Sequence, residues 1–151
     1  MISKNILGQA RENYMIQRII QKASQPSSIY LLLFRITLGL VFISIGWGKF
    51  SNFDRTIGYF SSINIPFPVI SAWLAATTEL VAGLFILVGL YTRAAAIPLA
   101  IVMAVATLTH LSDVSTIIDF LKLDAWKYFS MSLILLVTGA GKLSLDTIFK
   151  K

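Results

Sequence analysis

The chain has 151 residues, of which 56% are hydrophobic and only 13% charged, and its formal net charge is +6. Its mean hydropathy of +0.78 excludes an ordinary soluble domain and indicates an integral membrane protein. The absence of cysteine excludes thiol chemistry, and one histidine cannot supply both axial ligands of a bis-histidine haem. The basic residues flank apolar stretches, so we interpret them as topology signals and expect neither a nucleic-acid partner nor a metal site.

The first 28 residues are polar and basic, with apolar side chains at roughly helical spacing. This pattern predicts an amphipathic helix that lies on the membrane surface and ends at residues 24–28. Polar residues interrupt every apolar run in this segment, which is not typical of a cleavable signal peptide.

Four apolar stretches follow, each near the ~20 residues that a helix needs to cross a hydrocarbon core about 30 Å thick. We expect spans at about residues 29–50, 69–91, 92–111 and 126–143. The fold class predicted is therefore all-α, an integral membrane four-helix bundle over residues 29–146 with an N-terminal amphipathic surface helix and a basic tail at 147–151.

The connections between the spans differ in length. Residues 51–68 are predicted as a loop, because Pro66 and Pro68 disfavour helix at the residues before them. The third span follows the second almost directly. Residues 112–125 are charged and contain a short apolar run, 116–121, which we expect at the membrane interface.

Charge asymmetry predicts the orientation. With four spans, both termini share one side of the membrane. That side carries Lys4, Arg11, Arg18, Lys22, Arg93, Lys142, Lys150 and Lys151, and the other carries Lys49, Arg55, Lys122 and Lys127. The excess predicts cytoplasmic termini in a bacterial inner membrane, with Arg93 as a topology anchor.

Glu79 is the most informative residue of the chain, because it lies near the middle of its span and its short side chain reaches neither interface. An ionisable group at that depth usually faces the bundle interior and has a partner. Two interpretations stay open, a structural ion pair and a carboxyl that exchanges a proton or binds substrate. Gly83 is among the small residues around it that are expected to pack helices closely.

Arg35 and Lys49 share a face of the first span, because 14 residues at about 100° each return to within about 40° of the same direction. Gly39 and Gly46 lie on that face, which indicates a surface directed into the bundle. Either cation could instead extend to its nearest interface and act as an anchor.

Depths follow from the rise of about 1.5 Å per residue, counted from the cytoplasmic side. Arg35 is expected about 9 Å deep, Glu79 about 18 Å, His110 about 27 Å and Lys49 about 30 Å. We therefore expect Glu79 within reach of Arg35, and a polar cavity lined by these four residues. Thr78 and Thr107 are expected close by and complete the predicted substrate-binding set, with Glu79 as the candidate catalytic residue.

Several short segments together resemble the DoxX family of small bacterial membrane proteins. They are Arg35 and Gly39, Gly-Trp-Gly-Lys-Phe at 46–50, Ile-Pro-Phe-Pro at 65–68, Glu-Leu-Val-Ala-Gly at 79–83, Gly-Leu-Tyr-Thr-Arg-Ala-Ala at 89–95, residues 103–110, and Gly-Ala-Gly-Lys-Leu-Ser-Leu-Asp at 139–146. The resemblance covers about residues 30–146 and implies four membrane helices. Many similar proteins carry a histidine directly before the glycine matching Gly46, where this chain has Ile45.

The resemblance implies a link to quinone, since the family takes its name from a membrane subunit of an archaeal thiosulfate:quinone oxidoreductase. The first functional hypothesis is thus a quinone-interacting redox subunit with no electron carrier of its own, which needs bound quinone or a redox partner protein. Arg35, Lys49 or His110 would donate a hydrogen bond to a quinone carbonyl, and Glu79 would exchange a proton. The alternatives are a non-catalytic assembly factor or anchor for a soluble partner, and a small-solute transporter that would have to form a homo-oligomer.

Overall fold

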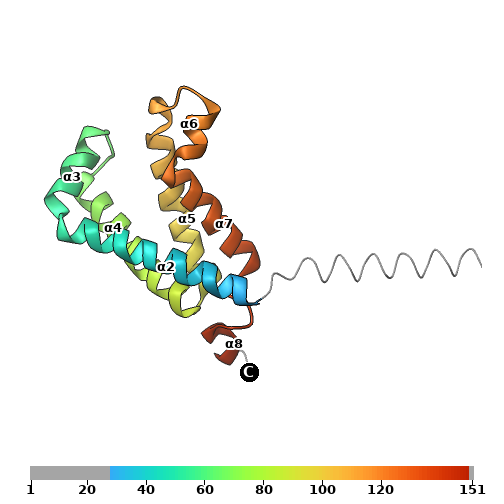
Figure 1. The fold of residues 1–151 in the computed structure, drawn as a ribbon. Helices are drawn as coiled ribbons and strands as arrows, with labels where there is room; N and C mark the ends of the chain where they lie inside the picture. Colours follow the sequence, from blue (N-terminus) through green and yellow to red (C-terminus); the bar gives the residue numbers. More distant parts are fainter. Residues whose placement is uncertain (1–27, 150–151) are drawn as a thin grey trace, which may run out of the picture.

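The structure is a computed structural model that describes residues 28–149, and all regular structure in this range is helical (Figure 1). The helices are α2 (Ser28–Ser51), α3 (Phe53–Ser62), α4 (Pro68–Val88), α5 (Thr92–Thr109), the 3₁₀ helix η1 (Leu111–Asp113), α6 (Ile117–Lys122), α7 (Asp124–Thr138) and α8 (Leu145–Phe149). The all-α membrane fold is confirmed. The predicted amphipathic helix of the first 28 residues lies outside the described range.

Three of these helices are long and apolar enough to cross a membrane: Ile29–Ser51, Pro68–Val88 and Thr92–Thr109. They correspond to the first three predicted spans. The fourth predicted span contains α7, whose 15 residues extend only about 22 Å at 1.5 Å per residue. Helix α7 ends at Thr138, and Gly139 follows with a φ of +73°, a backbone conformation that favours glycine. Because α7 is this short, the fourth crossing stays a prediction.

The predicted loop at residues 51–68 was wrong for its first part, because α3 occupies residues 53–62. The two prolines restrict only the residues next to them, and they lie beyond the end of α3. The turn after α3 uses left-handed backbone at Asn64 and Phe67, with φ values of 56° and 48°.

The long helices form two antiparallel pairs, α2 with α4 and α5 with α7, which diverge from one another in Figure 1. Residues 89–91 join α4 to α5 in a tight turn, where Gly89 adopts a φ of +73°. We call the end with this turn the closed end. The other end, where α2 and α5 finish and α4 begins, is the open end.

Close packing of α2 on α4 depends on glycine. A side-chain carbon added at Gly39 would lie 2.9 Å from the carbonyl oxygen of Gly83, and one added at Gly46 would lie 2.7 Å from the backbone nitrogen of Leu80. These two glycines and Gly83 therefore have the packing role predicted from the sequence. Phe42 and Leu99 are fully buried where the two helix pairs meet, and the Phe42 ring contacts Tyr128 of α7 edge-on.

Candidate functional site: an intramembrane cavity at the open end

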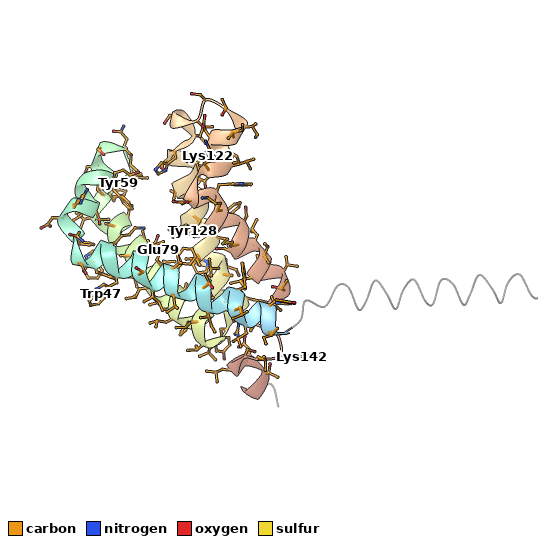
Figure 2. The ribbon with its side chains drawn as sticks, viewed as in Figure 1. Trp47, Tyr59, Glu79, Lys122, Tyr128 and Lys142 are labelled. Atoms are coloured by element: carbon orange, nitrogen blue, oxygen red, sulfur yellow. The ribbon has the colours of Figure 1, made fainter. Side chains whose placement is uncertain are left out.

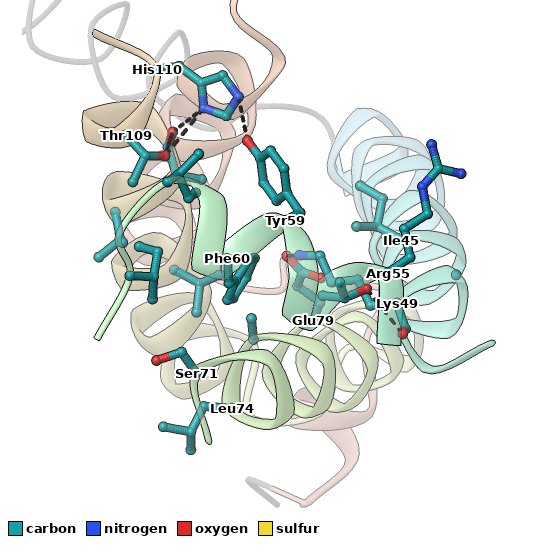
Figure 3. Close-up of a pocket in the computed structure, with 18 of the residues that line it drawn as sticks. Ile45, Lys49, Arg55, Tyr59, Phe60, Ser71, Leu74, Glu79, Thr109 and His110 are labelled. Atoms are coloured by element: carbon teal, nitrogen blue, oxygen red, sulfur yellow. Dashed lines mark hydrogen bonds and ion pairs between the residues drawn. The ribbon is translucent and has the colours of Figure 1, made fainter. Parts of the chain in front are cut away.

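A cavity of about 780 Å³ lies at the open end, enclosed by α2, α3, α4 and α5 (Figure 3). Most of its wall is apolar, with Ile45 from α2, Phe60 from α3 and Val102 from α5. Its charged and titratable lining consists of Lys49, Arg55, Tyr59, Glu79 and His110. The cavity thus combines a hydrophobic interior with a few convergent polar groups, which is typical of a small-molecule site.

Lys49 and Glu79 form an ion pair in the wall of the cavity, with Nζ of Lys49 2.5 Å from Oε1 of Glu79. Glu79 is completely buried, whereas a quarter of the Lys49 side chain is exposed. Figure 2 shows Glu79 between α2 and α4, while Trp47, two residues from Lys49, projects outward. Contact at Gly46 brings α2 close enough to α4 for the lysine to reach the carboxylate. Among the described atoms, Oε2 of Glu79 has no hydrogen-bond partner.

Tyr59 and His110 link α3 to the end of α5 across the cavity (Figure 3). The Tyr59 hydroxyl lies 3.1 Å from Nε2 of His110, and Nδ1 of the same ring lies 2.8 Å from the carbonyl oxygen of Ala106. A carbonyl can only accept, so Nδ1 carries the proton of the neutral ring and Nε2 accepts from the tyrosine. His110 is therefore held in one tautomer by its own helix.

Arg35 does not line the cavity, contrary to the prediction. It lies at the closed end, 1% exposed, where Nη2 donates to the carbonyl oxygen of Leu143 at 2.5 Å. Its guanidinium fills the space beside Gly89, where any side chain would collide with it. Glu79 therefore pairs with Lys49, and Arg35 instead ties α2 to the segment that follows α7.

Asp146 completes this arrangement at the closed end. Its carboxylate accepts from the backbone nitrogens of Tyr91 at 2.7 Å and Thr92 at 3.3 Å, which are at the start of α5. A carboxylate at a helix N-terminus satisfies free N–H groups and is favoured by the helix dipole. Arg93 donates to the carbonyl oxygen of Val137 at 3.0 Å, so it also contacts the end of α7.

Thr78 and Thr107 do not line the cavity either. Thr107 is buried and donates to the carbonyl oxygen of Met103 in the preceding helical turn at 2.8 Å, so its hydroxyl is used within α5. Of the four residues predicted to form one cavity, Lys49, Glu79 and His110 come together and Arg35 is separate.

Most of the polar lining residues that were not predicted lie on α3 or directly before it: Asn52, Arg55, Thr56 and Tyr59; Ser71 of α4 and Thr109 of α5 are the others. The first four were missed because their segment was predicted as a loop. An available signal was the amphipathic spacing of residues 53–62, where the apolar residues Phe53, Ile57 and Phe60 recur at helical intervals between polar ones.

Comparison with known proteins places the chain in a family. The family model described as DoxX matches residues 30–111. The chain belongs to the DoxX family. The matched segment contains every residue that lines the cavity, from Ile45 to His110. No solved structure matches the chain at a significant level.

Several DoxX-family relatives have been named. "Inner membrane protein YphA" of Escherichia coli is 33% identical over 82% of this chain and 91% of its own length. "Uncharacterized membrane protein Rv3486" of Mycobacterium tuberculosis is 40% identical over 57% of this chain and 52% of its own length. "Putative oxidoreductase CatD" of Bacillus subtilis is 31% identical over 79% of this chain and 87% of its own length.

Proposed function

We propose that this DoxX-family protein is a quinone-interacting, redox-associated subunit of the bacterial inner membrane, and that the cavity at the open end is its quinone site. The observation that carries the proposal is the Lys49–Glu79 ion pair in the wall of an otherwise apolar intramembrane cavity. The names of two relatives, "Inner membrane protein YphA" and "Putative oxidoreductase CatD", support it.

An ion pair is a costly way to hold two membrane helices together. Taking both charges out of water costs several kcal/mol per ion, and well-packed apolar side chains in their place are often neutral or stabilising by about 1–4 kcal/mol. The helices α2 and α4 already pack closely through Gly39 and Gly46. A paired carboxylate at this depth is therefore better explained by a function in binding or proton exchange than by packing alone.

The donors of the cavity fit a quinone. Lys49 has three N–H donors and uses one on Glu79, so its remaining donors can bind a quinone carbonyl in the cavity. The apolar walls suit the ring, and the volume of about 780 Å³ falls in the range of small-molecule sites. Tyr59 and His110 add polar groups at the far end of the same cavity.

The chemistry divides between this chain and a partner. Reduction of a quinone to a quinol takes up two electrons and two protons. In this proposal a redox partner protein supplies both electrons. Both protons come from water on the outer side of the membrane and pass one at a time through Glu79 and Lys49 to the two quinone oxygens. With both termini in the cytoplasm, as the sequence predicts, the open end and its cavity face the outer side of the membrane.

The proposal is tested by quinone binding to the purified full chain in nanodiscs, measured with a radiolabelled short-chain quinone and by extraction of copurified quinone. Glu79→Gln keeps the shape of the side chain and removes its negative charge. We therefore expect the affinity for quinone to fall by about tenfold or more, which corresponds to at least ~1.4 kcal/mol. Asp124→Asn is the matched control, because Asp124 forms an exposed ion pair with Lys127 outside the cavity.

Wild-type protein that binds no quinone, or a Glu79→Gln variant that binds as well as wild type, would contradict the proposal. Deleting residues 1–24 distinguishes the quinone site from the alternative function, an assembly factor or anchor for a partner protein. That deletion should abolish function if the N-terminal segment recruits a partner, and it should leave quinone binding unchanged if the cavity is the site.

A further inference from the structure

The wall of the cavity is incomplete between α4 and α5. Leu74 of α4 and Ile101 of α5 both line the cavity, yet their side chains are 63% and 60% exposed. Val105, one turn beyond Ile101, also lines it and is 46% exposed. Side chains that face the cavity and the outside at once form the rim of an opening, which we call the side opening and define by these three residues.

The side opening lies at the depth of the hydrocarbon core. Leu74 lies six residues after Pro68, the first residue of α4, and Ile101 lies eight residues before Thr109, the last residue of α5. At about 1.5 Å per residue, these positions are roughly 9 Å and 12 Å below the open end. A hydrocarbon core is about 30 Å thick, so the opening is placed among the lipid tails when the open end lies at the membrane surface.

The lysine and arginine of the cavity lie on α2 and α3, whereas the polar lining residue next to Leu74 on α4 is the uncharged Ser71. Lys49 comes from α2, and Asn52, Arg55 and Thr56 come from the start of α3 and the residue before it. Figure 3 shows Leu74 across the close-up from Arg55. The cavity therefore has its basic side chains on the side of α2 and α3 and mainly apolar side chains between α4 and α5, which is complementary to an amphiphile.

We propose that the quinone bound here has an isoprenoid tail, and that it enters from the bilayer and keeps its tail in the side opening. This inference rests on the proposed function and adds the route by which the quinone enters the cavity and the place where its tail lies. A cavity of about 780 Å³ has room for a drug-sized ring and little more. A long tail must therefore leave the cavity, and the exposed apolar side chains of Leu74, Ile101 and Val105 offer it an exit.

The test compares a tail-free quinone with a long-tailed isoprenoid quinone on the full chain in nanodiscs, by equilibrium binding of each radiolabelled compound. The double variant Leu74→Trp/Ile101→Trp narrows the side opening from both helices. The matched control is Leu108→Trp, because Leu108 is equally exposed at 63% on α5 but does not line the cavity. Melting temperatures show that each variant is folded, and the milder Ile101→Phe serves if the double variant is not.

We expect the double variant to bind the long-tailed quinone about tenfold more weakly and the tail-free quinone within about twofold of wild type, with the control unchanged for both. Equal affinities of wild type and double variant for the long-tailed quinone would overturn the side opening and leave the proposed function standing. Equal losses for both quinones would also overturn it, because the tryptophans would then act on the ring site. Wild-type protein that binds neither compound would overturn the proposed function itself.

Discussion

Close contact between α2 and α4 at Gly46 is expected to be necessary for the stability of the protein and for the Lys49–Glu79 ion pair. In Gly46→Ala the new methyl group would lie 2.7 Å from the backbone nitrogen of Leu80 and 2.9 Å from the carbonyl oxygen of Ala76. Ordinary contacts of this kind begin at 3.4 Å. Both neighbours are backbone atoms of a helix, so relief requires α2 and α4 to separate by about 0.7 Å rather than a side chain to rotate. Overpacking of this kind costs about 1–3 kcal/mol.

Gly48→Ala is the control, because it changes the same residue type two positions along the same helix. A methyl group at Gly48 meets no atom within 4 Å. The substitution should therefore be neutral or stabilising by about 0.5–1 kcal/mol, through the lower backbone entropy of alanine in the unfolded chain.

The assay is thermal unfolding in detergent, read by circular dichroism and by aggregation. One kcal/mol shifts the melting temperature of a chain of this size by about 2–4 °C, so Gly46→Ala should lower it by roughly 2–12 °C. Lys49 is less than one turn from Gly46, so the separation should also weaken its ion pair with Glu79 and reduce quinone affinity. A Gly46→Ala melting temperature at or above that of Gly48→Ala would refute the close contact of α2 with α4.

Three further variants test other contacts. Asp146→Ala removes the acceptor at the start of α5, including that for Tyr91, and should destabilise by about 0.5–2 kcal/mol in thermal unfolding. Tyr59→Phe removes the hydrogen bond to His110 and should raise hydrogen exchange of the α3 amides, with a stability loss of only about 0.5–1.5 kcal/mol. Arg35→Leu leaves a buried carbonyl without its donor and should cost about 1–3 kcal/mol, yet short-chain quinone affinity should stay within about twofold of wild type. A selective loss of quinone affinity in the arginine variant would restore the substrate-binding role predicted from the sequence.

The long helices and their inward faces could be predicted because a membrane protein needs long apolar stretches to span the bilayer and small residues where its helices pack. Apolar runs long enough to cross a bilayer are rare outside membrane helices, and three of them match helices of the structure. Gly39 and Gly46 on the face of Arg35 and Lys49 indicated which side of the first span packs inward, and both glycines do contact α4.

The partner of Glu79 could not be predicted, because depth counted from helix ends requires that the helices begin level. The contacts show a different register: Gly39 lies against Gly83 and Leu87, and Gly46 lies against Ala76 and Leu80. Glu79 is therefore level with about Ile45. That is about four residues, or 6 Å, from Lys49 and about ten residues, or 15 Å, from Arg35. The predicted register of α4 against α2 therefore differed from the observed one by roughly 6 Å. This difference is enough to make Lys49, and not Arg35, the partner of Glu79.

The location of the cavity follows from how the two ends are held. At the closed end, Arg35 of α2 binds the backbone carbonyl of Leu143, and Asp146 binds the backbone nitrogens of Tyr91 and Thr92. These bonds join α2, the segment that follows α7 and the start of α5. At the open end, Lys49 and Glu79 join α2 only to α4, and nothing comparable joins α4 to α5 in the described residues beyond the Tyr59–His110 contact through α3. The two helix pairs diverge from the closed end toward the open end in Figure 1, and the cavity lies between them at the open end. Lys49, which binds α2 to α4 through Glu79, therefore lies on the wall of this cavity, where a ligand can reach its ammonium group.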